Sequence, residues 1–213
     1  MKLYSIVFLL LSITSCAQSS NNKITDNKNR KVGGGCECCE AIYEQAPDFS
    51  LINEVDTLPD FNETGPKMLV YGTIYKKDGK TPAAGVVLYI YHTDQTGLYT
   101  SRGVQTGCAK RNGYLRGWVK TNSEGQYSFY TLKPAPYPNA KIPAHIHPVI
   151  KEPGLIEYYI DEYRFDDDPL LSTEERNRAE NRGGNGIIRL SKDASGLLLC
   201  KRDIVLGKNI PGY

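Results

Sequence analysis

The sequence predicts a mainly β fold, an antiparallel β-sandwich with one short helix. From residue 68 onward, short runs rich in β-branched and aromatic residues alternate with turns rich in Gly, Pro, Asn and Asp. Only one segment carries a clear helix-start signal. A chain of 213 residues with 40% apolar residues is long enough to bury the core of a single such domain.

Seven or eight strands are expected, and turn chemistry predicts how some of them pair. An Asp-Gly step at Asp78 lies between strands 68–75 and 86–91 and predicts an antiparallel pair. A compact turn at 122–125 predicts a second hairpin. The strands of this second hairpin are expected at 117–121 and 126–132. Further strands are expected at 144–150, 155–165, 187–190 and 197–206.

The helix is expected over residues 173–181. Ser172 and Glu175 have the spacing of a capping box, in which each side chain accepts a hydrogen bond from the other residue's backbone N–H. Gly183 and Gly184 end the helical pattern.

The first residues have the composition of an export signal. Lys2 precedes an apolar stretch at 3–13 that is too short to span a bilayer as a helix. The run Ile13-Thr14-Ser15-Cys16 resembles the bacterial lipobox, in which the cysteine is lipidated, although an ordinary secretory signal remains an alternative. The expected organisation is a signal peptide (1–15), a lipidated flexible tether (16–35) and one domain (36–213), anchored in the cell envelope outside the cytoplasm, in the periplasm or at the outer membrane.

Five further cysteines raise the question of disulfides in an exported chain. Cys36, Cys38 and Cys39 form a cluster, while Cys108 and Cys200 stand alone. Disulfides involving one or two of the cluster are expected, with the connectivity open. A zinc site is the weaker alternative, because no second cysteine pair follows.

Overall charge excludes one class of partner. Lys and Arg number 26 against 24 Asp and Glu, a formal net charge of +2. So small a charge provides no basic field for nucleic acid.

Chemistry-bearing residues concentrate between positions 99 and 147. His145 and His147 are separated by one residue, so on an extended strand both imidazoles project from the same face and can reach one metal ion. Tyr137 lies between prolines on a loop just upstream, and a metal ion would lower the pKa of its phenol. Phenolates combined with neutral imidazoles favour ferric iron over zinc. His92 follows a strand in polar surroundings and is expected at the surface.

The order of these motifs resembles the intradiol ring-cleavage dioxygenases, the family of catechol 1,2-dioxygenase and protocatechuate 3,4-dioxygenase. The resemblance covers residues 68–168 and is carried by the Gly-Leu-Tyr step ending at Tyr99, the Arg-Gly-Trp run from Arg116, the Pro-Tyr-Pro loop at Tyr137 and the His-Ile-His at 145–147. It implies one mononuclear non-haem Fe(III) held by Tyr99, Tyr137, His145 and His147.

The same resemblance implies an activity. Such enzymes cleave a catechol-type substrate with O₂ to a muconate-type product, and Tyr137 corresponds to the tyrosinate that leaves the metal and accepts a substrate proton. The family's members form dimers or larger oligomers, which implies a homo-oligomer without identifying its interface.

Two positions depart from the family pattern. Ile142 stands where the known enzymes have an arginine above the bound substrate, and Glu162 aligns with a glutamine near the metal. Lys141 or Arg116 are the candidates to replace the missing positive charge. These departures support the alternative function, a non-catalytic transthyretin-like module of the cell envelope that binds iron or catechol compounds.

Overall fold

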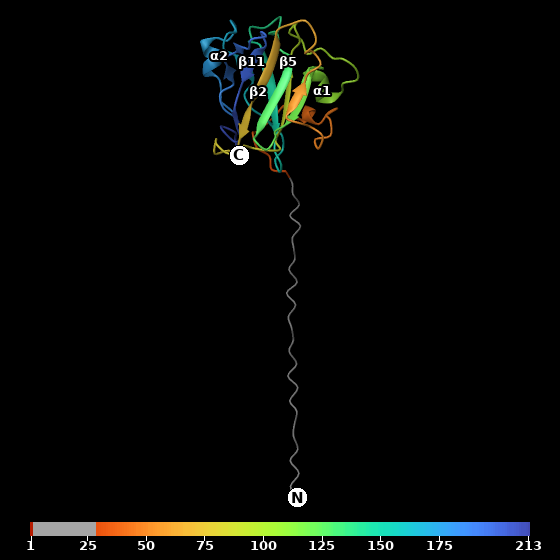
Figure 1. The fold of residues 1–213 in the computed structure, drawn as a ribbon, viewed down its shortest axis with the longest axis vertical. Helices are drawn as coiled ribbons and strands as arrows, with labels where there is room; N and C mark the ends of the chain where they lie inside the picture. The colour runs from red at the N-terminus through yellow and green to blue at the C-terminus, as the bar shows by residue number, and fades with distance from the viewer. Residues whose placement is uncertain (2–28) are drawn as a thin grey trace.

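Two mixed β-sheets pack face to face in the computed structural model, which describes residue 1 and residues 29–213 (Figure 1). The first sheet has the order β1-β5-β2-β11-β10, with β12 also paired to β2. Its strands are β1 (Val55–Thr57), β5 (Gln126–Leu132), β2 (Lys67–Tyr75), β11 (Leu198–Lys201), β10 (Ser191–Lys192) and β12 (Ile204–Val205). The predicted β-sandwich is confirmed.

The second sheet carries the histidines. Its order is β4-β3-β6-β8-β9, with β7 also paired to β6. Its strands are β4 (Arg116–Lys120), β3 (Val87–His92), β6 (His145–Lys151), β8 (Tyr163–Phe165), β9 (Ile187–Ile188) and β7 (Tyr158–Tyr159). Because β6 lies between β3 and β8, both edges of its backbone are paired where the histidines sit.

Alternating burial explains why the two sheets close on each other. Along β2 every second residue is buried, and the pattern continues in β5. The inward residues of the first sheet, such as Val70 and Phe129, join one core cluster with Leu88 and Ile146 of the second. Removing these side chains from water drives the packing of the two layers.

Both predicted hairpins are wrong, because each turn joins strands of opposite sheets. The turn after β2 forms, with a bridge between Tyr75 and Pro82, but the chain then crosses to the second sheet as β3. The turn at 122–125 likewise leads from β4 in one sheet to β5 in the other. A strand that buries one face has the same alternating pattern in either layer, so the pattern could not identify its partner.

The pairing is also less uniformly antiparallel than predicted. Four strand pairs are parallel: β1 with β5, β11 with β2, β12 with β2, and β8 with β9. The long runs expected at 155–165, 187–190 and 197–206 form short strands interrupted by turns.

The helices differ from the expectation in number and length. α2 (Thr173–Asn177) ends earlier than predicted, and its start is capped by Ser172, whose side chain accepts a hydrogen bond from the Glu175 N–H. Glu175 pairs with Arg164 and Arg178 instead of completing the capping box. α1 (Gly107–Asn112) and the 3₁₀ helix η1 (Cys39–Ile42) were not predicted.

All three clustered cysteines form disulfides. Cys36 pairs with Cys39, and Cys38 pairs with Cys108, so η1 is tied to α1 across a sequence separation of 70. Cys200 is buried and free. Cys38, Glu40 and Cys108 lie close enough together to suggest a metal site, but the disulfide occupies both sulfurs.

Residues before position 36 are already part of the folded domain. The backbone of Arg30 bridges Leu155, and Val32 is buried in the main core. The tether expected over 16–35 therefore overlaps the domain at its end. The expected signal peptide, apart from Met1, and Cys16 lie outside the described residues. Among the described residues, no helix is long and apolar enough to cross a membrane.

Candidate metal centre

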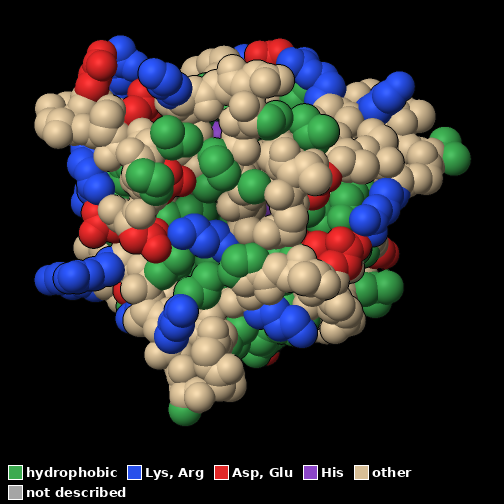
Figure 2. Space-filling view, turned by 90° about the horizontal axis from the view of Figure 1, so that it is seen from above, with side chains coloured by type: hydrophobic (Ala, Val, Ile, Leu, Met, Phe, Trp, Pro, Cys, Tyr) green, Lys and Arg blue, Asp and Glu red, His purple; other side chains and the backbone are tan. Residues whose placement is uncertain are grey.

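The two histidines lie at the first and third positions of β6. Tyr91 of β3 is opposite His147, and Arg164 of β8 is opposite His145. With these neighbours on either side, both imidazoles project from the same face of a strand held at its two edges. On the face seen in Figure 2, histidine is visible only as small spots between other side chains.

The two tyrosines come from loops that touch each other. Tyr99 follows a turn organised by the Asp94 carboxylate, which accepts hydrogen bonds from the Thr96 and Leu98 N–H groups. Gly97 in this turn has φ +78°, and a Cβ built there would lie 2.1 Å from the Pro136 carbonyl oxygen. Only glycine permits this approach, which brings the loop of Tyr99 against the loop of Tyr137.

Four potential ligand atoms form a closed ring. Tyr99 Oη lies 2.8 Å from Tyr137 Oη, and Tyr137 Oη lies 3.3 Å from His145 Nε2. His145 Nε2 lies 3.0 Å from His147 Nε2, which lies 2.9 Å from Tyr99 Oη. Donor atoms that share one metal ion at about 2 Å from each have this spacing.

Hydrogen bonding outside the ring fixes the proton of His145. Its Nδ1 lies 2.7 Å from the Pro143 carbonyl oxygen, which can only accept, so Nδ1 carries the proton and Nε2 presents a lone pair. Tyr91 stacks on His147, with centroids 4.6 Å apart and planes inclined by 16°, and holds that imidazole in orientation. With two imidazole nitrogens and two phenol oxygens converging, the residues present fit a hard or borderline cation.

The electrostatics of the site favour neutral imidazole. Burial, together with the charges of His145, His92 and Arg164, lowers the pKa of His147 well below its ordinary value. Neutral imidazole is the form that binds a metal. Burial and the neighbouring Tyr137 raise the pKa of Tyr99, so its phenol is neutral until a cation offsets that cost.

Glu162 lies beside the ring of donor atoms. Its Oε1 is 3.9 Å from His147 Nδ1, and its Oε2 accepts a hydrogen bond of 3.0 Å from Arg164. Arg164 also contacts Glu175 of α2, at 3.2 Å. A carboxylate on the outer nitrogen of a ligating histidine favours the tautomer that ligates through the other nitrogen.

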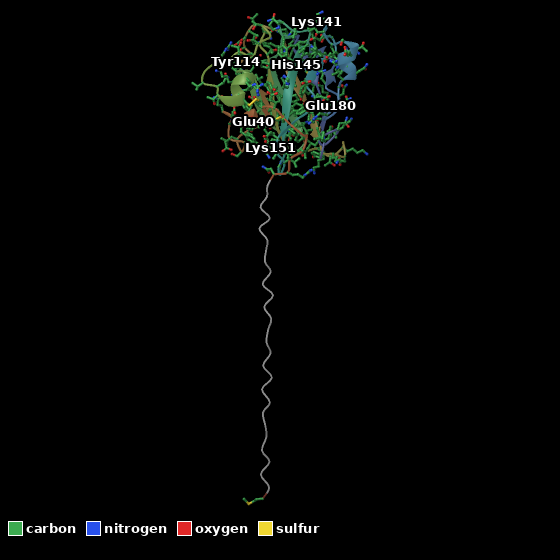
Figure 3. The ribbon with its side chains drawn as sticks, turned by 180° about the vertical axis from the view of Figure 1, so that it is seen from behind. Glu40, Tyr114, Lys141, His145, Lys151 and Glu180 are labelled. Atoms are coloured by element: carbon green, nitrogen blue, oxygen red, sulfur yellow. A yellow bond between two sulfur atoms is a disulfide. The ribbon has the colours of Figure 1, made fainter. Side chains whose placement is uncertain are left out.

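The expected substitutes for the family arginine lie elsewhere. Ile142 is 43% exposed, and Lys141 is exposed at the rim of the domain in Figure 3, whereas His145 lies further inside. Arg116 is buried, and its guanidinium donates to the Glu44 carbonyl at 3.1 Å and to the Gln45 side chain at 2.9 Å. Arg116 is thus engaged away from the four ligands.

His92 is buried instead of lying at the surface. Its Nε2 is 2.8 Å from the oxygen of the Thr131 hydroxyl, and this hydroxyl donates its hydrogen to Asp60 at 2.9 Å. This network satisfies polar groups between the sheets and is separate from the ring of donor atoms.

A cavity of about 360 Å³ adjoins the four-atom ring. Tyr99, Tyr137 and His147 line it together with Tyr91 and, from the disulfide-linked segment, Glu37, Cys38, Arg111 and Asn112. The sequence analysis missed Tyr91, Glu37 and Arg111. The alternating pattern of the strand that carries Tyr91 could have predicted its position beside His147. Arg111 could not have been identified without knowing that α1 forms.

Comparison with known proteins supports the motif-based resemblance. The family model described as Dioxygenase matches residues 44–182, well over half of the chain. Catechol 1,2-dioxygenase 1 of Acinetobacter lwoffii is 40% identical over 86 residues, which cover 40% of this chain and 26% of that protein. The protocatechuate 3,4-dioxygenase beta chain of Burkholderia cepacia is 28% identical over 114 residues, which cover 51% and 48%.

The solved structures agree in fold. An intradiol ring-cleavage dioxygenase from Tetranychus urticae superposes with a TM-score of 0.52 at 22% identity, covering 72% of this chain and 86% of that one. The chain spans about a quarter to a half of the two curated relatives it matches. From the family match, and with the fold and motif order in agreement, the chain belongs to the intradiol ring-cleavage dioxygenases.

Proposed function

We propose that this chain is a non-haem Fe(III)-dependent dioxygenase that cleaves catechol-type aromatics with O₂ to muconate-type dicarboxylic acids. The observation that carries the proposal is the ring of two phenol oxygens and two imidazole nitrogens with 2.8–3.3 Å between neighbours. Two hard anionic oxygens beside two neutral nitrogens suit a trivalent cation.

Tyr99, Tyr137, His145 and His147 would hold the iron. When bound, ferric iron would act as a Lewis acid that makes a chelated catechol reactive towards O₂. The reaction is balanced without another reductant, because catechol and O₂ together contain every atom of the muconic acid product.

Tyr137 has the position required to move a proton. Its phenol oxygen is part of the ring, yet its side chain is partly exposed on a loop at the cavity. As a phenolate, it can accept the proton of a catechol hydroxyl that enters the cavity. Tyr99 lies against Tyr91, with ring centroids 5.9 Å apart.

The remaining residues orient the site. His145 is held by the Pro143 carbonyl, and His147 by the stacked Tyr91 ring. The cavity gives a planar ring access to Tyr99 and Tyr137 beside the ring of Tyr91.

The visible absorption spectrum of the iron-loaded protein tests this proposal. We expect a tyrosinate-to-iron charge-transfer band that shifts when catechol is added without oxygen and decays with O₂ uptake once air is admitted. A colourless protein that ignores catechol would overturn the proposal. Colour and catechol binding without O₂ uptake would favour the non-catalytic envelope module.

Substitution of Tyr137 tests the assigned proton acceptor. Tyr137→Phe should weaken the charge-transfer band and abolish ring cleavage, because one anionic ligand and the proton acceptor are both lost. Tyr71→Phe is the matched control, since Tyr71 lies in β2 of the other sheet. Unchanged iron content and activity in Tyr137→Phe would contradict the assignment.

We also propose that Cys16 is lipidated and holds the domain at the cell envelope, outside the cytoplasm. The lipobox-like run at 13–16 and the polar composition of the residues that follow support this location.

A further inference from the structure

One part of the cavity wall is formed by the proposed metal ligands, and another by a segment that two disulfides hold in place. Cys38 in this wall is bonded to Cys108 of α1, and Cys36 is bonded to Cys39 of η1. The Glu44 carboxylate accepts hydrogen bonds from the Cys108 and Ala109 N–H groups, at 3.3 and 2.6 Å, and fixes the start of α1. The position of α1 is therefore determined by covalent bonds as well as by packing.

α1 carries a positive charge to this wall. Among the described residues that line the cavity, Arg111 is the one with a permanent positive charge, and it lies there with Tyr99, Tyr137 and His147. The family arginine position holds Ile142, and Arg116 is engaged by Glu44 and Gln45. Arg111 is thus the cation available to a molecule bound in the cavity.

The present partner of Arg111 is bound weakly and can be replaced by another anion. Arg111 Nη2 lies 2.6 Å from Glu37 Oε1, and Nη1 donates a weak hydrogen bond of 3.4 Å to Cys38 Sγ. The side chains of Arg111 and Glu37 are 63% and 78% exposed. Ion pairs this exposed contribute little to stability in other proteins, so a ligand anion can exchange for Glu37.

The cavity has room for a substituted ring. Its volume of about 360 Å³ lies within the range of pockets that hold whole small molecules. A catechol whose hydroxyls face Tyr99 and Tyr137 would lie in the cavity that Arg111 also lines, so a ring substituent can reach the Arg111 guanidinium.

We propose that Arg111 is a specificity-determining residue that binds a carboxylate carried by the catechol substrate, with Glu37 as the internal competitor for the same guanidinium. The proposal rests on the proposed function, because it concerns which catechols enter that site. A guanidinium and a carboxylate form charge-assisted hydrogen bonds that a neutral ring cannot make.

The test is an anaerobic binding titration of the iron-loaded full chain with catechol and with 3,4-dihydroxybenzoate, followed by the visible spectrum. The measured quantity is the Kd for catechol divided by the Kd for 3,4-dihydroxybenzoate. Arg111→Gln should lower this ratio about tenfold, the effect of losing one charge-assisted contact, while the Kd for catechol changes little. Glu37→Gln should raise the ratio, because it removes the competitor and keeps the cation.

Arg102→Gln is the matched control. Arg102 is also an exposed arginine in an ion pair, at 2.6 Å from Glu63, but it lies outside this cavity, so its loss should leave the ratio unchanged. A wild-type protein that binds catechol, with a ratio that neither Arg111→Gln nor Glu37→Gln alters, would overturn the inference and leave the proposed function intact. A wild-type protein that binds neither ligand would overturn both.

Discussion

At the scale of single residues, the candidate site depends on hydrogen bonds made outside the ring of donor atoms. The Pro143 carbonyl fixes the proton of His145 on Nδ1, and the Asp168 carboxylate accepts a hydrogen bond of 2.8 Å from the Ala144 N–H directly before the first ligand. Glu162 occupies the outer side of His147 and is itself held by Arg164. Groups that hold ligands in this way reduce the reorganisation needed when a metal binds.

The free thiol provides a prediction that depends on pH. Burial raises the pKa of Cys200 from 9.0 to about 12, because the thiolate would be desolvated in the core. The folded protein should therefore resist alkylation by iodoacetamide between pH 7 and 10, whereas the unfolded chain should react increasingly as pH rises towards 9. The raised pKa stabilises the fold fully below pH 9, and this contribution is lost as pH rises towards 12.

In the Cys16→Ser protein with its disulfides intact, Cys200 is the remaining thiol, so mass spectrometry of this variant measures the labelling of Cys200 alone. Labelling should appear only when urea unfolds the domain. Rapid labelling of the folded protein at pH 8 would show that Cys200 is accessible and contradict its buried position.

At the scale of elements, two loops and two disulfide-linked helices assemble the site around β6. Gly97 allows the loops of Tyr99 and Tyr137 to touch, and the disulfide between Cys38 and Cys108 fixes another part of the cavity wall. Neither loop has regular secondary structure to hold its tyrosine, so these contacts determine whether the phenol oxygens meet.

Gly97→Ala tests the contact between the loops. The added Cβ would meet the Pro136 carbonyl oxygen at 2.1 Å, so the loops must separate and iron affinity should fall roughly tenfold or more. Gly103→Ala is the control, because Gly103 has a similar φ of +80° but open space around its Cβ position. Both variants should lose about 1–2 kcal/mol of stability from the left-handed backbone. Equal iron affinities, measured by competition with a chelator, would exclude the proposed collision.

The two disulfides should contribute unequally to stability. Cys38 and Cys108 are 70 residues apart, whereas Cys36 and Cys39 are three apart. By the loop-entropy relation, replacing the first pair with serines should cost about 4 kcal/mol, and replacing the second about 1.5 kcal/mol. Urea unfolding of the two double variants measures the difference, and equal losses would show that chain entropy is not the main contribution.

The elements also show what local sequence could and could not predict. Alternating apolar residues predicted most of the strands, and the His-x-His spacing predicted that His145 and His147 share a face, since both signals are local. The sequence did not predict which of the two sheets each strand belongs to, because this depends on the course of the chain after Pro82 and Asn122. α1 has only six residues and depends on Glu44 and Cys38, which lie more than sixty positions away, so Arg111 was missed with it.

At the scale of the whole molecule, the proposed metal ligands and the start of the described domain lie at opposite ends of β6. His145 begins this strand and Lys151 ends it, about 20 Å away at 3.3 Å per residue. Arg30 bridges Leu155, shortly after Lys151, and in Figure 3 Lys151 lies nearer than His145 to the end where the chain enters the domain. An anchor before residue 30 would therefore attach to the domain at the end away from the site.

Cys16→Ser tests this arrangement in the whole protein. If Cys16 carries the proposed lipid, the variant should move from the membrane pellet to the soluble fraction, because the buried acyl chains that hold the protein are lost. Its charge-transfer band and its Kd for catechol should match those of the wild-type protein, since the anchor lies far from the four ligands. A variant that stays in the membrane fraction would contradict lipidation at Cys16. A released variant with altered catechol binding would instead show that the membrane contributes to the site, contrary to its position at the far end of β6.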